Sequence, residues 1–82
     1  GYMKPQEWGC ITQEKQKIYL HVFDMGTQNI SLKNFPFRQI KKVYFLKNGQ
    51  SIPYQLNAGI FSISSLQLKP GNPDEVIVVE AI

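Results

Sequence analysis

Apolar and polar positions alternate along most of this chain in short runs with a period of two. In residues 17–23 the aliphatic side chains of Ile18, Leu20 and Val22 fall on one side of an extended backbone, while two aromatic rings and a histidine fall on the other. Bulk on both sides is typical of a strand that is covered on both faces. This segment is the strongest strand signal in the chain.

Six further segments carry a strand pattern, and turn residues separate them. The dipeptide Asn48–Gly49 lies between two apolar runs and predicts a two-residue hairpin turn with positive φ at both positions. We predict an all-β fold, an antiparallel two-sheet β-sandwich of about seven short strands, as a single domain over residues 1–82. The six further strands are predicted at residues 8–13, 29–33, 40–46, 52–56, 60–64 and 76–82.

Length and composition agree with one small globular domain. The chain has 82 residues and a hydrophobic content of 43%, which is ordinary for an ordered protein. One face of each long strand should form the core between the sheets. The predicted core consists of Ile18, Leu20, Val22, Phe61, Ile63, Ile77 and Val79.

The basic charge is too dispersed to indicate a polyanionic partner. The formal net charge is +3, and its nine Lys and Arg cluster only at Lys41–Lys42 and at the Lys15/Lys17 pair. No nucleic-acid recognition motif accompanies them. No apolar run approaches the length of about 20 residues that spans a bilayer. We therefore expect neither a nucleic-acid partner nor a membrane partner.

The acidic residues do not form a catalytic pair. Asp24 lies in a predicted turn, and the neighbours Asp74 and Glu75 point to opposite sides of an extended backbone. Retaining glycoside hydrolysis needs two carboxyl groups about 5–5.5 Å apart. We therefore predict no catalytic residue in this chain.

One cysteine and one histidine, Cys10 and His21, are the chain's sole residues of these types. Zinc sites need several such ligands, so we expect no metal site and no cofactor. The two could be neighbours on paired strands, which would allow a thiol–imidazole contact. The alternative, which we favour, is a histidine packed on a sheet face with a hydrogen bond to the backbone.

The remaining candidates are surfaces. Strands that are apolar on both sides exceed what a stand-alone sandwich needs, which favours a docking face. Two aromatic rings, Trp8 and Tyr54, have contexts that allow exposure and are candidate sugar contacts. The candidate docking face comprises Tyr19, His21, Phe23, Val76 and Val78.

At these residues the chain resembles a known family. Trp8–Gly9, residues 18–24, residues 43–46, Asn48–Gly49 and residues 76–80 follow one another in an order similar to the C-terminal β-sandwich domain of α-L-fucosidases of glycoside hydrolase family twenty-nine. The resemblance covers nearly all of the chain.

The chain departs from the family at two points. Met25–Gly26 stand where the family usually has Trp-Pro, and Cys10 stands where an aromatic or aliphatic residue is common. The rim of the turn after residue 24 is therefore altered, while the predicted fold is unaffected.

The resemblance implies an accessory role. Family members release terminal L-fucose with carboxylates on an N-terminal (β/α)₈ barrel, which this chain lacks, so the resemblance implies a C-terminal fragment of a retaining α-L-fucosidase whose partner is that barrel. Fucosylated glycans are a further possible partner. A secreted, periplasmic or lysosomal parent is implied by the family alone. An independent carbohydrate-binding module and a protein-interaction sandwich are the alternatives.

Overall fold

Two antiparallel β-sheets make up the described part of the chain. The computed structural model describes residues 5–6, 8–24, 26–64, 66, 68 and 75–82, and among them it contains strands and no helix. The predicted all-β class and the two-sheet sandwich are confirmed. The strands are β1 (Pro5–Gln6), β2 (Gly9–Glu14), β3 (Lys17–Val22), β4 (Ile30–Leu32), β5 (Ile40–Phe45), β6 (Gln55–Asn57), β7 (Ile60–Ile63) and β8 (Glu75–Ala81).

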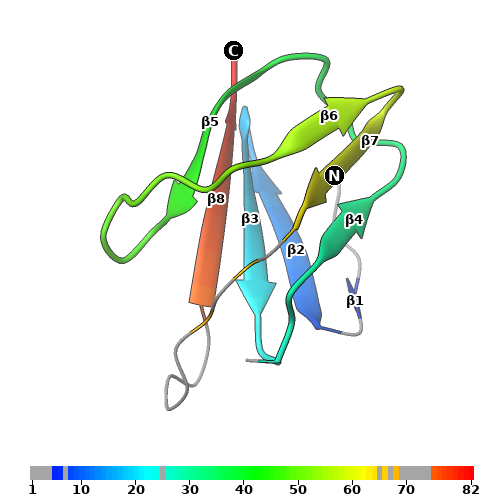
Figure 1. Cartoon of the computed structure of the whole chain (residues 1–82). Helices are drawn as coiled ribbons and strands as arrows, with labels where there is room; N and C mark the ends of the chain where they lie inside the picture. Colours follow the sequence, from blue (N-terminus) through cyan, green and yellow to red (C-terminus); the bar gives the residue numbers. More distant parts are fainter. Residues whose placement is uncertain (1–4, 7, 25, 65, 67, 69–74) are drawn as a thin grey trace.

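The larger sheet has the strand order β1-β2-β3-β8-β5 and the smaller sheet the order β4-β7-β6. Figure 1 shows the three strands of the smaller sheet running obliquely across the larger sheet. The chain passes between the sheets after β3, β4, β5 and β7, so strands β3 and β8, far apart in sequence, become neighbours at the centre of the larger sheet. Only β1, a two-residue strand, has no counterpart among the predicted segments.

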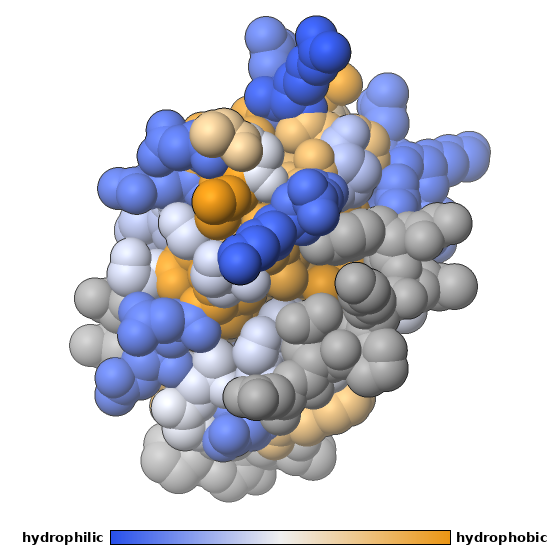
Figure 2. All heavy atoms as spheres, turned by 90° about the vertical axis from the view of Figure 1, so that its right-hand side faces the viewer, coloured by the Kyte–Doolittle hydropathy of each residue, from blue (hydrophilic) through white to orange (hydrophobic). Residues whose placement is uncertain are grey.

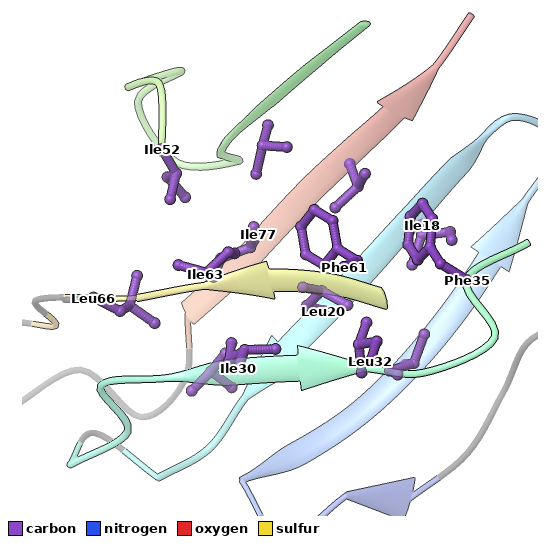
Figure 3. Packing of buried hydrophobic residues seen from close by; sticks show 14 residues of the cluster. Ile18, Leu20, Ile30, Leu32, Phe35, Ile52, Phe61, Ile63, Leu66 and Ile77 are labelled. Carbon is purple, nitrogen blue, oxygen red and sulfur yellow. The ribbon is translucent and has the colours of Figure 1, made fainter. Parts of the chain in front are cut away.

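The core lies between the two sheets. All seven predicted core residues are at most 1% exposed, which confirms the assignment of the inward faces. Figure 3 shows Phe61 and Ile63 of β7 pointing toward Leu20 and Ile77 of the larger sheet. Phe35 stacks on Phe61 with ring centroids 5.0 Å apart, so the loop that contains it closes the interior. The core residues of the larger sheet all lie on its inner face, and the residues that alternate with them lie on its outer face.

Strand β5 carries a β-bulge that reverses which face of the sheet its first side chain occupies. Ile40 pairs with Ala81 but Lys42 pairs with Glu80, so Lys41 is the extra residue. Simple alternation would place Ile40 on the same side as Lys42, yet Ile40 packs against the core. The bulge therefore brings an apolar side chain inward and leaves Lys42 on the outer face.

One hairpin turn differs from the expectation. Asn48–Gly49 does form a hairpin, but only Gly49 has positive φ, and the Gly49 N–H donates to the Phe45 carbonyl across a longer loop. The two-residue turn with positive φ at both positions occurs instead at Ala58–Gly59, with φ of 52° and 79°. Strand pairing of Asn57 with Ile60 requires that shorter turn.

The Trp8–Gly9 dipeptide anchors the start of the larger sheet. The Trp8 carbonyl accepts hydrogen bonds from the backbone N–H groups of Phe23 and Asp24 at 2.7 and 3.2 Å. A Cβ atom at Gly9 would lie 1.7 Å from the His21 carbonyl oxygen. Position 9 therefore has to be glycine for strands β2 and β3 to approach this closely.

Candidate functional site

The outer face of the larger sheet, the side turned away from the smaller sheet, carries the candidate docking residues. Strand register places its side chains in three rows that cross the sheet. The first row is Cys10, His21, Val76 and Leu46, the second row is Thr12, Tyr19, Val78 and Tyr44, and the third row is Glu14, Lys17, Glu80 and Lys42.

Two tyrosines cover the valine at the centre of the second row. Val78 is 1% exposed although it lies outside the core cluster, and its cross-strand neighbours are Tyr19 and Tyr44. Tyr19 and Tyr44 are themselves half-buried. Of the five residues predicted for a docking face, Val78 thus lies beneath the surface, while the other four keep accessible area.

The third row is a network of charges. The Tyr44 hydroxyl donates a hydrogen bond to Glu80 Oε2, Lys42 Nζ lies 3.8 Å from the same oxygen, and Lys42 Nζ also lies 4.9 Å from the centre of the Tyr44 ring. The hydrogen bond to Glu80, with burial and the nearby carboxylate charge, raises the pKa of Tyr44 to about 12. The same bond and the surrounding lysine charges lower the pKa of Glu80. This end of the face is polar, and Tyr44 and Lys42 both contact Glu80 there.

The first row is less polar and more open. His21 and Val76 are half-buried, whereas Leu46, at the far end of the row, is 56% exposed. Phe23 follows His21 on the same side of the chain and is also 56% exposed. Two large apolar side chains therefore project at this end of the outer face.

Cys10 and His21 are directly opposed across strands β2 and β3. The hydrogen-bond partner of the imidazole is the Thr12 hydroxyl, with Oγ1 3.0 Å from Nε2, so the predicted bond to the backbone is wrong in its partner. Thr12 shares the outer face with His21 because both lie on alternate positions of paired strands. The bond fixes the imidazole on the sheet surface.

A shallow pocket borders the exposed leucine. It has a volume of about 150 Å³ and is lined by Leu46, Lys47, Glu75 and Val76. Glu75 is 5% exposed and its Oε1 lies 2.9 Å from Lys47 Nζ. The pocket thus combines two apolar side chains with one buried, paired carboxylate.

The two candidate sugar contacts lie in different surroundings. Trp8 is half-buried, packs against the core and lines a polar pocket of about 370 Å³ together with Asp24, Thr27, Gln28 and Asn29. Tyr54 precedes β6, is 37% exposed and stacks on Phe61 with ring centroids 5.9 Å apart. Each ring therefore has a separate setting, and only Trp8 is accompanied by several hydrogen-bonding side chains.

Figure 2 views the molecule from the side of β1 and β4, where apolar residues form a patch bordered by projecting polar side chains. Among the described residues, no group of three or more His, Cys, Asp and Glu could hold a metal ion. Within the same part of the chain, no helix is long and apolar enough to cross a membrane.

Sequence reasoning missed Leu46, Tyr44 and Thr12 as members of the outer face. Residues 40–46 have bulk on both sides, so the pattern alone does not tell which side faces out. The register with β8 and the hydrogen bond from the Leu46 N–H to the Val76 carbonyl place Leu46 in the first row. Thr12 could have been suggested as the partner of His21 only from the register of β2 and β3. These contacts arise between strands, so a single strand pattern cannot reveal them.

Comparisons with known proteins place this fold. No family model matches the chain, and no curated protein matches it in sequence. Among solved structures, alpha-L-fucosidase isoenzyme 1 from Paenibacillus thiaminolyticus matches with a TM-score of 0.71 and 22% identity over 100% of this chain and 21% of that chain. An alpha-L-fucosidase GH29 from Bacteroides thetaiotaomicron matches with a TM-score of 0.73 and 22% identity over 98% of this chain and 18% of that chain.

The chain resembles a small part of GH29 fucosidases. It spans about a fifth of the length of the solved chains that it matches. At 22% identity the likeness shows the fold, and it confirms the resemblance predicted from the order of the strands.

Proposed function

We propose that this chain is a non-catalytic accessory domain of an α-L-fucosidase-like glycoside hydrolase, where it packs on a catalytic barrel at the C-terminal end of the protein and stabilises it. The observation that carries the proposal is the match of essentially the whole chain to about a fifth of two fucosidase chains. The order of strand motifs in the sequence supports the same parent. Barrel enzymes build their active sites on loops of the barrel itself. A sandwich that follows the barrel would therefore pack beside it and supply no catalytic residue.

The outer face of the larger sheet is the proposed contact with the barrel. Tyr19, His21, Phe23 and Val76 keep accessible area there, and Val78 supports them from beneath. A sheet whose second face is apolar is normally covered by another layer. Contacts between domains of one chain commonly bury about 600–1,500 Å², which a five-stranded face can supply.

Two assays test this function. The purified chain should release no nitrophenol from an aryl α-L-fucoside above buffer, and turnover that survives repurification would show a catalytic site in these residues. In the full-length gene product, deletion of residues 1–82 should lower the melting temperature and the soluble yield of the remaining protein. An unchanged melting temperature and yield after the deletion would reject the stabilising role.

A second candidate function, a carbohydrate-binding module, is favoured by one observation. The half-buried Trp8 ring borders a pocket that also offers the side chains of Asp24, Thr27, Gln28 and Asn29. An aromatic ring beside several hydrogen-bonding groups suits a sugar, which presents an apolar face and a rim of hydroxyls.

Trp8 is the chain's single tryptophan, so its fluorescence reports on this pocket alone. A fucosylated oligosaccharide should shift the emission of the wild-type chain, and Asn29→Ala should weaken that response while the fold is kept. Tyr54→Ala is the matched control because Tyr54 lies outside this pocket. A response that Asn29→Ala leaves intact, or no response at millimolar sugar, argues against binding here.

A further inference from the structure

We propose that a pocket at the edge of the smaller sheet binds a small apolar acid, a molecule with an aromatic or branched aliphatic body and one carboxylate. The pocket lies between the β4–β5 connection and the turn between β6 and β7, and its volume is about 340 Å³. Ligand pockets of folded proteins begin at about 300 Å³, so a molecule of this kind fits. The described residues that line it are Phe35, Phe37, Arg38, Leu56, Ala58 and Gly59.

Backbone hydrogen bonds hold the two walls of this pocket together. The Phe35 N–H donates to the Gly59 carbonyl at 2.8 Å, which joins the β4–β5 connection to the β6–β7 turn. Figure 1 shows the connection passing beside this turn. Where the connection ends, Ile40 pairs with Ala81 in the larger sheet. The connection is therefore fixed near both ends, and the pocket is formed before a ligand binds.

The apolar side of the pocket is built on the core. Phe35 is 7% exposed and stacks on Phe61, and the Phe37 ring packs edge-on against Phe35 with centroids 6.1 Å apart. Leu56 of β6 packs against the same core. Phe37 and Leu56 are both half-buried, so each keeps apolar area that a ligand can cover. Covering that area removes it from water and favours an apolar ligand body.

Arg38 supplies the charge that selects a carboxylate. It is the chain's single arginine, its side chain is exposed, and it makes no ion pair or hydrogen bond with another described residue. None of the described lining residues is acidic. A guanidinium group presents a planar fork of N–H donors that matches the two oxygens of a carboxylate. One cation beside apolar walls therefore complements a ligand with one negative charge.

The lining also distinguishes this pocket from the one beside Trp8. The pocket beside Trp8 offers four polar side chains, whereas Arg38 has the one polar side chain among the described residues that line the pocket proposed here. A sugar bound here would bring several hydroxyl groups against apolar walls, and a polar group that loses water without gaining a hydrogen bond costs free energy. The pocket therefore suits a ligand body without hydroxyl groups.

The test is a titration of the isotope-labelled chain with phenylpropionate, followed by two-dimensional NMR at physiological ionic strength. We expect a dissociation constant of about 1 mM, which the affinity per atom of small ligands allows. The largest amide shifts should fall on Phe37, Arg38, Ala58 and Gly59. Phenylpropanol, the neutral analogue, should bind at least about fivefold more weakly because it lacks the charge.

Three variants isolate the role of the arginine. Arg38→Gln should weaken the binding of phenylpropionate at least about fivefold, and Arg38→Lys, which keeps the charge without the fork, about twofold. Lys42→Gln is the matched control because it removes an exposed cation outside the pocket, and it should leave the affinity unchanged. Since the Arg38 side chain is exposed, the melting temperature of Arg38→Gln should stay within about 2 °C of wild type, which shows that the fold is intact.

The outcomes are distinct. Saturable shifts confined to the pocket, with the expected losses for Arg38→Gln and for phenylpropanol, support the site. An affinity that Arg38→Gln leaves intact, or equal affinities for the acid and the alcohol, would show that no carboxylate is recognised and would overturn the proposal. Glucuronate binding as tightly as phenylpropionate would make the ligand an acidic sugar and refute an apolar acid. No saturable shift at about 10 mM phenylpropionate would reject the pocket as a ligand site.

Discussion

The outer faces of the two sheets differ although their inner faces share one core. On the smaller sheet the outer row is Ser31, Ser62 and Gln55, three polar side chains that pair across β4, β7 and β6. The equivalent positions of the larger sheet hold Tyr19, Val78 and Tyr44. The core therefore dictates the inner face of each sheet and leaves the outer face to be set by its surroundings.

This difference shows which side of the sandwich is complete in water. A polar outer face needs no further layer, and Ile60 is its single large apolar residue with substantial exposure in the described chain. The larger sheet keeps Phe23 and Leu46 exposed at one end and a charged network around Glu80 at the other. The comparison agrees with solvent on the smaller sheet, and we propose that a partner covers part of the larger one.

The largest expected effect tests the assignment of inner and outer faces. Leu20→Ala removes a fully buried side chain of β3 and should lower the free energy of unfolding by about 2–5 kcal/mol. Ser31→Ala, on the polar outer face, should change it by less than about 0.5 kcal/mol. Urea denaturation of both variants measures the difference. An unchanged midpoint for Leu20→Ala would contradict the assignment of faces.

The next effect concerns the close approach of strands β2 and β3 in the larger sheet. Gly9→Ala should destabilise the chain by roughly 3 kcal/mol, because a Cβ atom 1.7 Å from the His21 carbonyl forces β2 and β3 apart. Gly49→Ala is the matched control: nothing lies within 4 Å of its Cβ position, so only the strain of a φ of 74° remains. We expect that control to lose about 1 kcal/mol in the same denaturation experiment. Equal losses would show that the close approach at Gly9 is not the cause.

Much of the fold was predictable because each long strand carries its own alternation. Ile18, Leu20 and Val22 were assigned to the core from a single segment, and all three are 0% exposed. Strand β1 was missed because Pro5–Gln6 has no apolar alternation, and it exists only through its pairing with β2. The sequence pattern therefore predicts strands that bury side chains better than strands that only extend a sheet edge.

Features that depend on pairing were not predictable. The bulge at Lys41 changes which side Ile40 occupies, and only the register with β8 reveals it. The two-residue turn fell at Ala58–Gly59 and not at Asn48–Gly49, because the pairing of flanking residues sets loop length. The candidate docking residues stay a prediction for another reason: their rows are visible in the structure, while the proposed partner lies outside it.

The charge network at the third row gives a pH prediction that distinguishes this end of the outer face. The folded pKa of Tyr44 is about 12 against an ordinary value of 10.0, so unfolding releases a proton between these pH values and stability falls as pH rises through that window. The pKa of Glu80 is lowered from 4.5, so its stabilisation is present above about pH 4.5 and is lost as pH falls through the lower folded value. Glu80→Gln should weaken both dependences.

Phenolate absorbance measures the alkaline limb directly. In wild type we expect one late titration step, and Tyr44→Phe should remove it, which would assign the step to Tyr44. Glu80→Gln should move the same step toward pH 10. A late step that survives in Tyr44→Phe would assign it to another residue. A step that Glu80→Gln leaves in place would show that the hydrogen bond to Glu80 does not hold the phenol in its protonated form.

The smallest expected effect concerns one tight turn in each sheet. The outer faces of the two sheets differ, and this test asks whether their turns are equally strained. Ala58 in the β6–β7 turn and Lys15 in the β2–β3 turn have φ of 52° and 55°, a region that costs an ordinary L-residue about 1–2 kcal/mol. Asparagine tolerates this region, so Ala58→Asn and Lys15→Asn should each raise the free energy of unfolding by about 0.5–1 kcal/mol. Thermal melts of both variants measure the gain. Gains of similar size place the strain in both sheets, whereas a gain confined to Lys15→Asn would mean that Ala58 is held in place by contacts of the smaller sheet that asparagine disrupts.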